Sequence, residues 1–465
     1  MDAPLPKPSF NPNKLLKEQF VSNLTGSSLL ELVALTVTIP ILVLIRHSFT
    51  SIPITGDSLK KKNEDASFEH RSFKAYLATL TLDFLVIVVP MLLFFTVLGD
   101  WNYILASLFT ILTLLYIAVK RPGGPSPDLG DPNSLRAYIT SYRVIVMIIT
   151  VLCILAVDFR IFPRRYAKTE TYGASLMDLG VGAFVLANSF VSRQARNIAS
   201  VNWKTAIVSS SPLILLGFFR LVTTTGVDYQ VHMSEYGVHW NFFFTLAAIS
   251  ILTSFINIPP QYSGVFGSFI LVGYQFSLMH GLNHYLLSNE RGTDIISQNK
   301  EGIFSIFGYW GMYLIGVHLG NYLIFGSHSS AFRSSRWFRT RVWVLSILFW
   351  LLTVLLDRHV ERISRRTCNL PYITMVLADN LQLISILTLA DLIPGRKTSI
   401  LEEALNQNLL ATFLLANILT GLVNLSVDTL STSSTTALFI MLIYSYILST
   451  VIGIAAYFGM KLKFW

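Results

Sequence analysis

Long apolar stretches separated by short polar segments recur along the whole chain. A helix needs about 20 apolar residues to cross a bilayer, with about 17 as the lower end. Such stretches predict thirteen membrane-spanning helices, at residues 27–45, 75–98, 101–119, 143–159, 174–192, 204–222, 239–258, 264–284, 303–325, 342–357, 371–393, 408–427 and 435–458. The pattern therefore predicts an all-α fold, a polytopic transmembrane helix bundle of about 13 spans.

Composition supports a membrane protein with one large domain. Hydrophobic residues make up 52% of the 465 residues and charged residues only 13%, against about 25% charged residues in soluble domains. Residues 1–26 form a polar N-terminal segment without the apolar core of a signal peptide. We expect a single transmembrane domain at residues 27–465, with polar connectors at 46–73, 120–142, 326–341 and 394–407.

The distribution of Lys and Arg predicts the orientation of the helices. An N-terminus in the lumen and a C-terminus in the cytosol place most of the 35 Lys and Arg on the cytosolic side, as cytosolic loops prefer. Two loops oppose this bias, and their cations are Arg160, Arg164, Arg165 and Lys168, and Arg358, Arg362, Arg365 and Arg366. Either these cations bind phosphate, or the true orientation is inverted.

The segment 156–168 carries the most concentrated candidate chemistry. Asp158 ends an apolar run, Pro163 excludes a helix in the following loop, and Lys168 closes the segment. Asp158 and Lys168 could form an interfacial salt bridge that closes the loop. Alternatively, a partly desolvated Asp158 acts as a general base, and Lys168 neutralises an oxyanion or holds a phosphate. Arg164 and Arg165 are either snorkelling anchors or a bidentate grip on phosphate.

Further polar and aromatic segments fall on the same predicted side of the membrane as Asp158 and Lys168. They follow even-numbered spans, which places them with the central segment on one face. We take their residues as candidates for substrate binding: Asp178, Glu235, His239, Trp240, Asn241, Asn299, Glu301, Arg365, Arg366 and Asn424. Packing and loop closure remain open as alternative roles, and His239 could also act as a base.

Several kinds of site are not supported by the sequence. His280 and His284 share a helix face but lack the Glu of a zinc motif and a third ligand, so we expect no metal. No nucleophile elbow, P-loop or dinucleotide fingerprint is present. The cations are spread over many loops, which favours anionic lipid headgroups over nucleic acid as partners.

Six motifs resemble the inositol acyltransferases of glycosylphosphatidylinositol (GPI) anchor synthesis. They are Ala-Val-Asp-Phe-Arg-Ile-Phe-Pro-Arg-Arg-Tyr-Ala-Lys at 156–168, Ser-Leu-Met-Asp-Leu-Gly-Val-Gly-Ala-Phe-Val at 175–185, Glu-Tyr-Gly-Val-His-Trp-Asn-Phe-Phe at 235–243, Asn-Lys-Glu-Gly-Ile-Phe-Ser at 299–305, Ser-Arg-Arg-Thr-Cys-Asn-Leu-Pro at 364–371 and Leu-Ala-Asn-Ile-Leu-Thr-Gly-Leu-Val-Asn at 415–424. The likeness extends from about residue 18 to the C-terminus. Arg160 stands where the family commonly has proline.

The resemblance implies a multi-pass enzyme of the endoplasmic reticulum membrane. Such an enzyme transfers a fatty acyl chain, usually palmitoyl, from acyl-coenzyme A to the inositol 2-hydroxyl of glucosaminyl-phosphatidylinositol. Acyl-coenzyme A is then a co-substrate, and no permanently bound cofactor is expected. In the family, the aspartate and lysine of the central motif are associated with catalysis, and they correspond to Asp158 and Lys168.

Two other classes of protein remain as alternatives. A lipid or solute transporter would also explain many spans and intramembrane charges, although it does not explain polar motifs on one face. A membrane O-acyltransferase could use His239 as its base.

Overall fold

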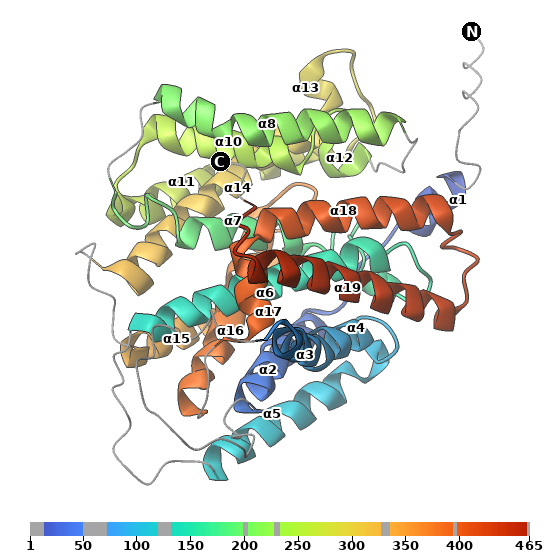
Figure 1. The fold of residues 1–465 in the computed structure, drawn as a ribbon. Coiled ribbons are helices and arrows are strands. Elements are labelled where there is room, and N and C mark those ends of the chain that lie inside the picture. Colours follow the sequence, from blue (N-terminus) through green and yellow to red (C-terminus); the bar gives the residue numbers. More distant parts are fainter. Residues whose placement is uncertain are drawn as a thin grey trace.

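The computed structural model describes residues 14–49, 72–119, 132–198, 203–226, 233–326, 335–393 and 398–462. Most of these residues belong to helices, which pack into one bundle (Figure 1). The first half comprises α1 (Lys14–Phe20), α2 (Leu29–Phe49), α3 (Phe73–Asp83), α4 (Val89–Phe94), α5 (Asn102–Val119), α6 (Pro132–Ala156), α7 (Leu179–Phe190), α8 (Trp203–Gly226), α9 (Met233–Tyr236) and α10 (Phe242–Ile256). The second half comprises α11 (Pro260–Ser277), α12 (Asn283–Leu287), α13 (Ile295–Gln298), α14 (Lys300–Gly320), α15 (Ser335–His359), α16 (Leu370–Leu387), α17 (Ile400–Gln407), α18 (Leu409–Ser426) and α19 (Ser434–Tyr457).

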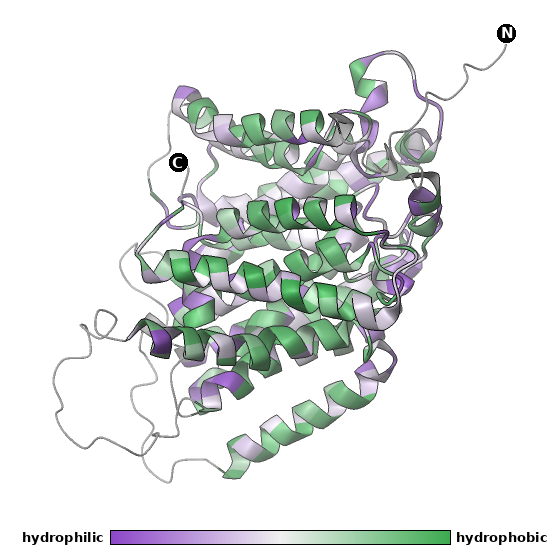
Figure 2. Ribbon diagram, turned by 45° about the vertical axis from the view of Figure 1, so that its right-hand side comes forward, coloured by the Kyte–Doolittle hydropathy of each residue, from purple (hydrophilic) through white to green (hydrophobic). Residues whose placement is uncertain are grey.

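The all-α transmembrane bundle predicted from the sequence is confirmed. Within the described ranges, eleven helical segments are long and apolar enough to cross a membrane, and two shorter apolar helices, α7 and α10, accompany them. Each of the thirteen predicted stretches corresponds to one of these helices. Figure 2 shows hydrophobic residues along the middles of the helices and hydrophilic residues gathered towards their ends. This is the distribution that a bilayer selects, because its core excludes polar groups.

Some predicted boundaries were wrong. α6 begins at Pro132 rather than at 143 and so includes Arg136 and Arg143. The connector expected at 394–407 contains α17, which begins with a capping box between Ser399 and Glu402. α15 also begins earlier than expected, at Ser335. Most of the connectors expected at 46–73 and 120–142 lie outside the described residues.

α16 is the central helix of the bundle. Of its 18 residues, 17 are buried, Leu370 being the exception, because the helix packs against α2, α6, α7 and α15. Asn369 caps its first turn by accepting a hydrogen bond from the backbone N–H of Tyr372, and Pro371 lies in that turn, where it removes no helical hydrogen bond. The outer helices differ from α16: only 17% of the apolar window of α8 is buried, and the same holds for α15, which packs on α16 along one side.

Glycines bring α14 close to its neighbours. A methyl group on Gly320 would lie 2.5 Å from the backbone oxygen of Phe190 in α7, and one on Gly316 would collide with the hydroxyl of Ser189. Small residues at such positions allow helices to approach closely in a membrane, where packing rather than the hydrophobic effect drives association. The position of α14 matters because its first turn carries the motif that begins at Asn299.

Candidate functional site

The loop from Val157 to Asp178 connects α6 to α7 and is shaped by Arg164. The guanidinium of Arg164 donates hydrogen bonds to the backbone oxygens of Val157, Phe159 and Phe162 at 2.9–3.1 Å. It also lies over the ring of Phe20, 4.0 Å from the centroid. Burial lowers the pKa of Arg164 to about 10. The loop is therefore folded around the guanidinium of Arg164, which is held by backbone oxygens of the loop and by the ring of Phe20.

Asp158 is buried at the start of this loop, with only 2% of its surface exposed. Asn424, at the end of α18, donates a hydrogen bond of 2.7 Å to Oδ2 of Asp158. The amide oxygen of Asn424 accepts one of 3.0 Å from Lys17 of α1. The carboxylate is thus oriented by two segments, α1 and α18, that lie far from it in the sequence.

Arg165 joins the loop to the helices on its other side. Its guanidinium contacts Glu31 of α2 and Asp100, each at 2.7 Å. The hydroxyl of Tyr166 also donates to Glu31, at 2.8 Å. Glu31 therefore has two partners from the loop, and the ion pairs of Arg165 anchor the loop to α2.

Lys168 pairs with Glu235 of α9. Its Nζ lies 2.7 Å from Oε1 and 2.9 Å from Oε2 of Glu235, and 37% of its side chain is exposed. Arg365 lies 3.8 Å from Oε1 of Glu235 and donates a 2.9 Å hydrogen bond to Asp178. The four side chains form a continuous row of alternating charge: Asp178, Arg365, Glu235, Lys168.

The charges in this row shift the pKa values of Glu235 and Lys168. Burial alone would raise the pKa of Glu235, but Lys168 and Arg365 outweigh it and hold that pKa at about 2. Partial burial lowers the pKa of Lys168, and Glu235 opposes this shift. Glu235 is therefore a carboxylate at neutral pH, and its charge favours the ammonium form of Lys168.

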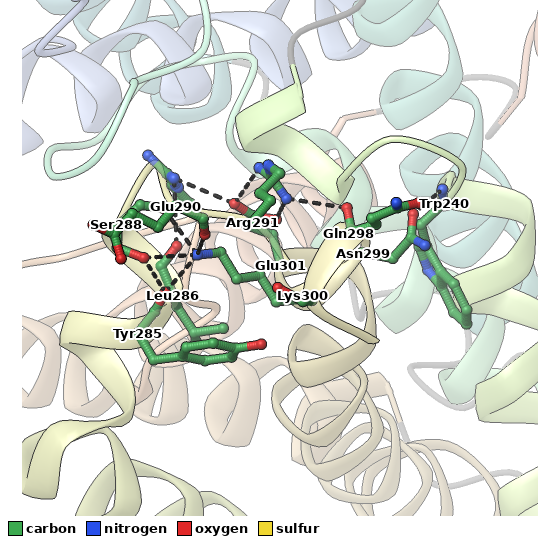
Figure 3. Close-up of polar contacts among 12 residues, drawn as sticks. Trp240, Tyr285, Leu286, Ser288, Glu290, Arg291, Gln298, Asn299, Lys300 and Glu301 are labelled. Carbon is green, nitrogen blue, oxygen red and sulfur yellow. Dashed lines mark hydrogen bonds and ion pairs between the residues drawn. The ribbon is translucent and has the colours of Figure 1, made fainter. Parts of the chain in front are cut away.

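The motif at 299–301 holds three neighbouring loops together (Figure 3). The side-chain oxygen of Asn299 accepts hydrogen bonds from the backbone N–H groups of His239 and Trp240, at 2.7 and 2.9 Å. The buried ammonium of Lys300 contacts the backbone oxygens of Tyr285, Ser288 and Glu290 and the hydroxyl of Ser288, at 2.7–3.0 Å. Glu301 forms ion pairs with Arg291 and Arg366. These contacts fix the loop geometry around the start of α14.

The neighbouring residues His239, Trp240 and Asn241 differ in their surroundings. The side chain of His239 is exposed. The indole of Trp240 donates to Thr245 at 3.0 Å. Asn241 caps α10 through the backbone N–H groups of Phe243 and Phe244, and its amide donates to the backbone oxygen of Gly217. Asn241 thus has a clear structural role, whereas His239 keeps its ring accessible.

All of the sequence-predicted site residues lie in loops or helix ends that meet at one end of the bundle. Their contacts connect segments before the first span and after the fourth, sixth, eighth, tenth and twelfth. The expectation of a single polar face is confirmed by these contacts. Asp158 and Lys168 share the loop, but Asp158 accepts a hydrogen bond from Asn424, whereas Lys168 pairs with Glu235.

The sequence did not reveal several partners of these residues. Lys17 lies in the polar N-terminal segment, Arg291 in a loop without a motif, and Lys300 was passed over between Asn299 and Glu301. Nothing in their spacing marks them. Within the described ranges, no three His, Cys, Asp or Glu side chains are grouped to hold a metal ion. A hollow between α6 and α19, lined by Met147, Val151 and Leu448 among others, encloses only about 10 Å³.

Comparison with known proteins identifies the family. The family model described as GWT1 matches residues 13–455. The chain is 57% identical to an uncharacterized protein of Arabidopsis thaliana over 91% of this chain and 98% of that protein. It is 34% identical to the phosphatidylinositol-glycan biosynthesis class W protein of Dictyostelium discoideum, over 96% and 98% of the two chains. It is 31% identical to the glucosaminyl-phosphatidylinositol-acyltransferase PIGW of Mus musculus, over 97% and 99%. The chain therefore belongs to the GWT1 family.

Proposed function

We propose that this protein transfers a fatty acyl chain from acyl-coenzyme A to the inositol 2-hydroxyl of glucosaminyl-phosphatidylinositol, in the membrane of the endoplasmic reticulum. As a member of its family the chain is an acyltransferase, and the mouse relative is named for acylation of this lipid. The match over nearly the whole of both chains supports carrying the reaction to this protein. Palmitoyl is the acyl chain that we expect.

The observation that carries the mechanism is the buried carboxylate of Asp158 at the end of α6, in one loop with Lys168. In the proposed reaction Asp158 removes the proton of the inositol hydroxyl as the hydroxyl oxygen attacks the thioester carbonyl. The carbon–sulfur bond then breaks, and coenzyme A leaves as a thiolate that takes up a proton. General bases of this kind contribute about 10²- to 10⁴-fold. The hydrogen bond from Asn424 fixes the direction of the carboxylate.

Lys168 has the complementary role. The attack on the thioester places negative charge on the carbonyl oxygen, and a nearby ammonium stabilises that charge more in the transition state than in the ground state. About a third of the Lys168 side chain is exposed, so its charge is accessible to a substrate in a way that a fully buried lysine would not be. Substrate phosphates are a second group that Lys168 could hold.

The variants Asp158→Asn and Lys168→Met test this mechanism, because both keep the side-chain size close to the original. We expect each to lose more than about 99% of acyl transfer to glucosaminyl-phosphatidylinositol in membranes, with normal expression and thermal stability. His239→Ala tests the competing assignment of the base, and it should fold normally because Asn299 binds the backbone of His239 and not its ring. Full activity in Asp158→Asn, or loss of activity only in His239→Ala, would refute the assignment.

A further inference from the structure

The row of charged residues Asp178, Arg365, Glu235 and Lys168 fixes both the backbone next to Lys168 and the ammonium at the end of its side chain. Asp178 accepts hydrogen bonds from the backbone N–H and the hydroxyl of Thr169, the residue that follows Lys168. Glu235 holds the ammonium through both of its oxygens. Arg365, with 4% of its side chain exposed, contacts both carboxylates. The position of the Lys168 backbone and that of its charge are therefore set by one connected unit.

The row draws on three segments that are distant in the sequence. Asp178 lies where the loop enters α7, Glu235 lies in α9, and Arg365 lies between α15 and α16. The backbone strengthens the join between two of them, because the N–H of Gly173 donates to the oxygen of Ile363 at 2.8 Å. A displacement of α9 or of the loop before α16 would thus change the position of the Lys168 ammonium.

The charge balance around Lys168 depends on Glu235. The charged groups that act on the ammonium are Glu235 from α9, Arg365 from the loop before α16 and Arg220 from α8. Two of these are cations, which disfavour a third positive charge, and only Glu235 favours it. Without the carboxylate, Lys168 would face two guanidinium groups in a partly desolvated position.

We propose that Glu235 is a positioning residue for the reaction: it keeps Lys168 charged and aims its ammonium, with Arg365 and Asp178 as the support that holds Glu235 in place. The proposal rests on the proposed function, because Glu235 can act in this way only if Lys168 takes part in the reaction. It differs from a direct contact between Glu235 and the substrate, which the sequence alone suggested. Both oxygens of Glu235 are already engaged by Lys168, and one also faces Arg365.

The variant Glu235→Gln tests the proposal in purified protein, with palmitoyl-coenzyme A and glucosaminyl-phosphatidylinositol. We expect kcat to fall about 100-fold, as for a misplaced catalytic group, while KM for both substrates stays within about threefold. The alkaline limb of the kcat profile reports loss of the Lys168 proton. In Glu235→Gln this limb should move to lower pH, because the charge that favours the ammonium is gone.

Two further variants make the result decisive. Glu235→Asp keeps the negative charge but places it farther from Lys168, so its alkaline limb should lie between those of the wild type and Glu235→Gln. If Glu235→Gln does not fold, the comparison of Glu235→Asp with the wild type tests the proposal. Glu170→Gln is the matched control, since Glu170 lies in the same loop as Lys168 and its side chain makes none of these contacts. A raised KM with an unmoved alkaline limb in Glu235→Gln would overturn the proposal and assign Glu235 to substrate binding.

The variant Lys168→Met separates this proposal from the proposed function. If Lys168→Met is fully active, the mechanism itself is wrong. If Lys168→Met is inactive and Glu235→Gln has wild-type kcat and pH dependence, the mechanism stands and only the role of Glu235 is wrong. In the double variant Lys168→Met/Glu235→Gln, we expect no loss beyond that of Lys168→Met, because a positioning residue has no effect once its target is absent.

Discussion

Glu301 offers a sharp test of whether a buried charge at this face binds substrate or supports the loops. Its side chain is fully buried between two arginines. Arg291 contacts both of its oxygens, at 2.8 and 3.0 Å, and Arg366 contacts Oε1 at 3.2 Å. Arg366 is itself 4% exposed. Figure 3 shows Glu301 at the start of α14 with Arg291 directed at it.

The variant Glu301→Gln removes the negative charge and leaves both guanidinium groups without their counter-ion. Breaking a buried ion pair by removing one partner costs about 3–5 kcal/mol, because the remaining charge stays desolvated. Arg291 can recover part of its hydration, since 17% of its side chain is exposed, whereas Arg366 cannot. We therefore expect about 3 kcal/mol of destabilisation, a large fraction of the 5–15 kcal/mol that typically separates folded from unfolded protein.

The assay is thermal unfolding of purified protein in parallel with KM for both substrates. Glu301→Gln should lower the apparent Tm by several degrees, and the folded fraction should keep a near-normal KM. The double variant Glu301→Gln/Arg366→Gln should be destabilised by less than the sum of the two single variants, because both single variants break the same Glu301–Arg366 ion pair. An unchanged Tm with a strongly raised KM would refute this reasoning and support a direct contact between Glu301 and substrate.

Two other variants follow from the contacts of single side chains. In Asn424→Ala, Asp158 loses a hydrogen bond to a charged group, worth about 1.5–3 kcal/mol of stability, so Tm should fall by a few degrees. The folded protein should also lose kcat/KM, because the base is no longer oriented; an unchanged kcat/KM would show that Asn424 does not orient the base. In Asn241→Ala, α10 loses its N-cap, which should cost about 1 kcal/mol of stability without altering KM, whereas a KM effect at normal Tm would indicate that Asn241 contacts substrate.

The helices could be predicted from the sequence because the bilayer imposes a minimum apolar length. The errors arose where helices carry polar residues that the bundle satisfies internally. α6 starts early because Ser141 can donate to Glu402 and Arg143 to Asn406, so these polar residues are compatible with a helix. Glu402 belongs to α17 and is buried against His47. Such pairings cross more than 250 residues of sequence and leave no trace in local hydropathy.

The site could be predicted only in part, for a related reason. Counting spans was enough to place the polar motifs on one face, because the side of each loop follows from the number of helices before it. The partners of each charge could not be counted in this way. Asp158 meets Asn424 and Lys168 meets Glu235 only because α18 and α9 pack where they do. A motif identifies residues that matter, and the structure shows which of them support the others.

The cations that oppose the predicted orientation fall into two groups. Arg165, Lys168, Arg365 and Arg366 have carboxylate partners, and Arg164 is surrounded by backbone oxygens. Their presence on this face is explained by interactions within the protein, so phosphate binding is not needed to account for them. The remaining cations of the two loops are exposed: Arg160, Arg358 and Arg362. If the phosphates of coenzyme A or of the lipid headgroup bind to these loops, the exposed arginines can reach them without breaking an ion pair, which makes them the first positions to examine.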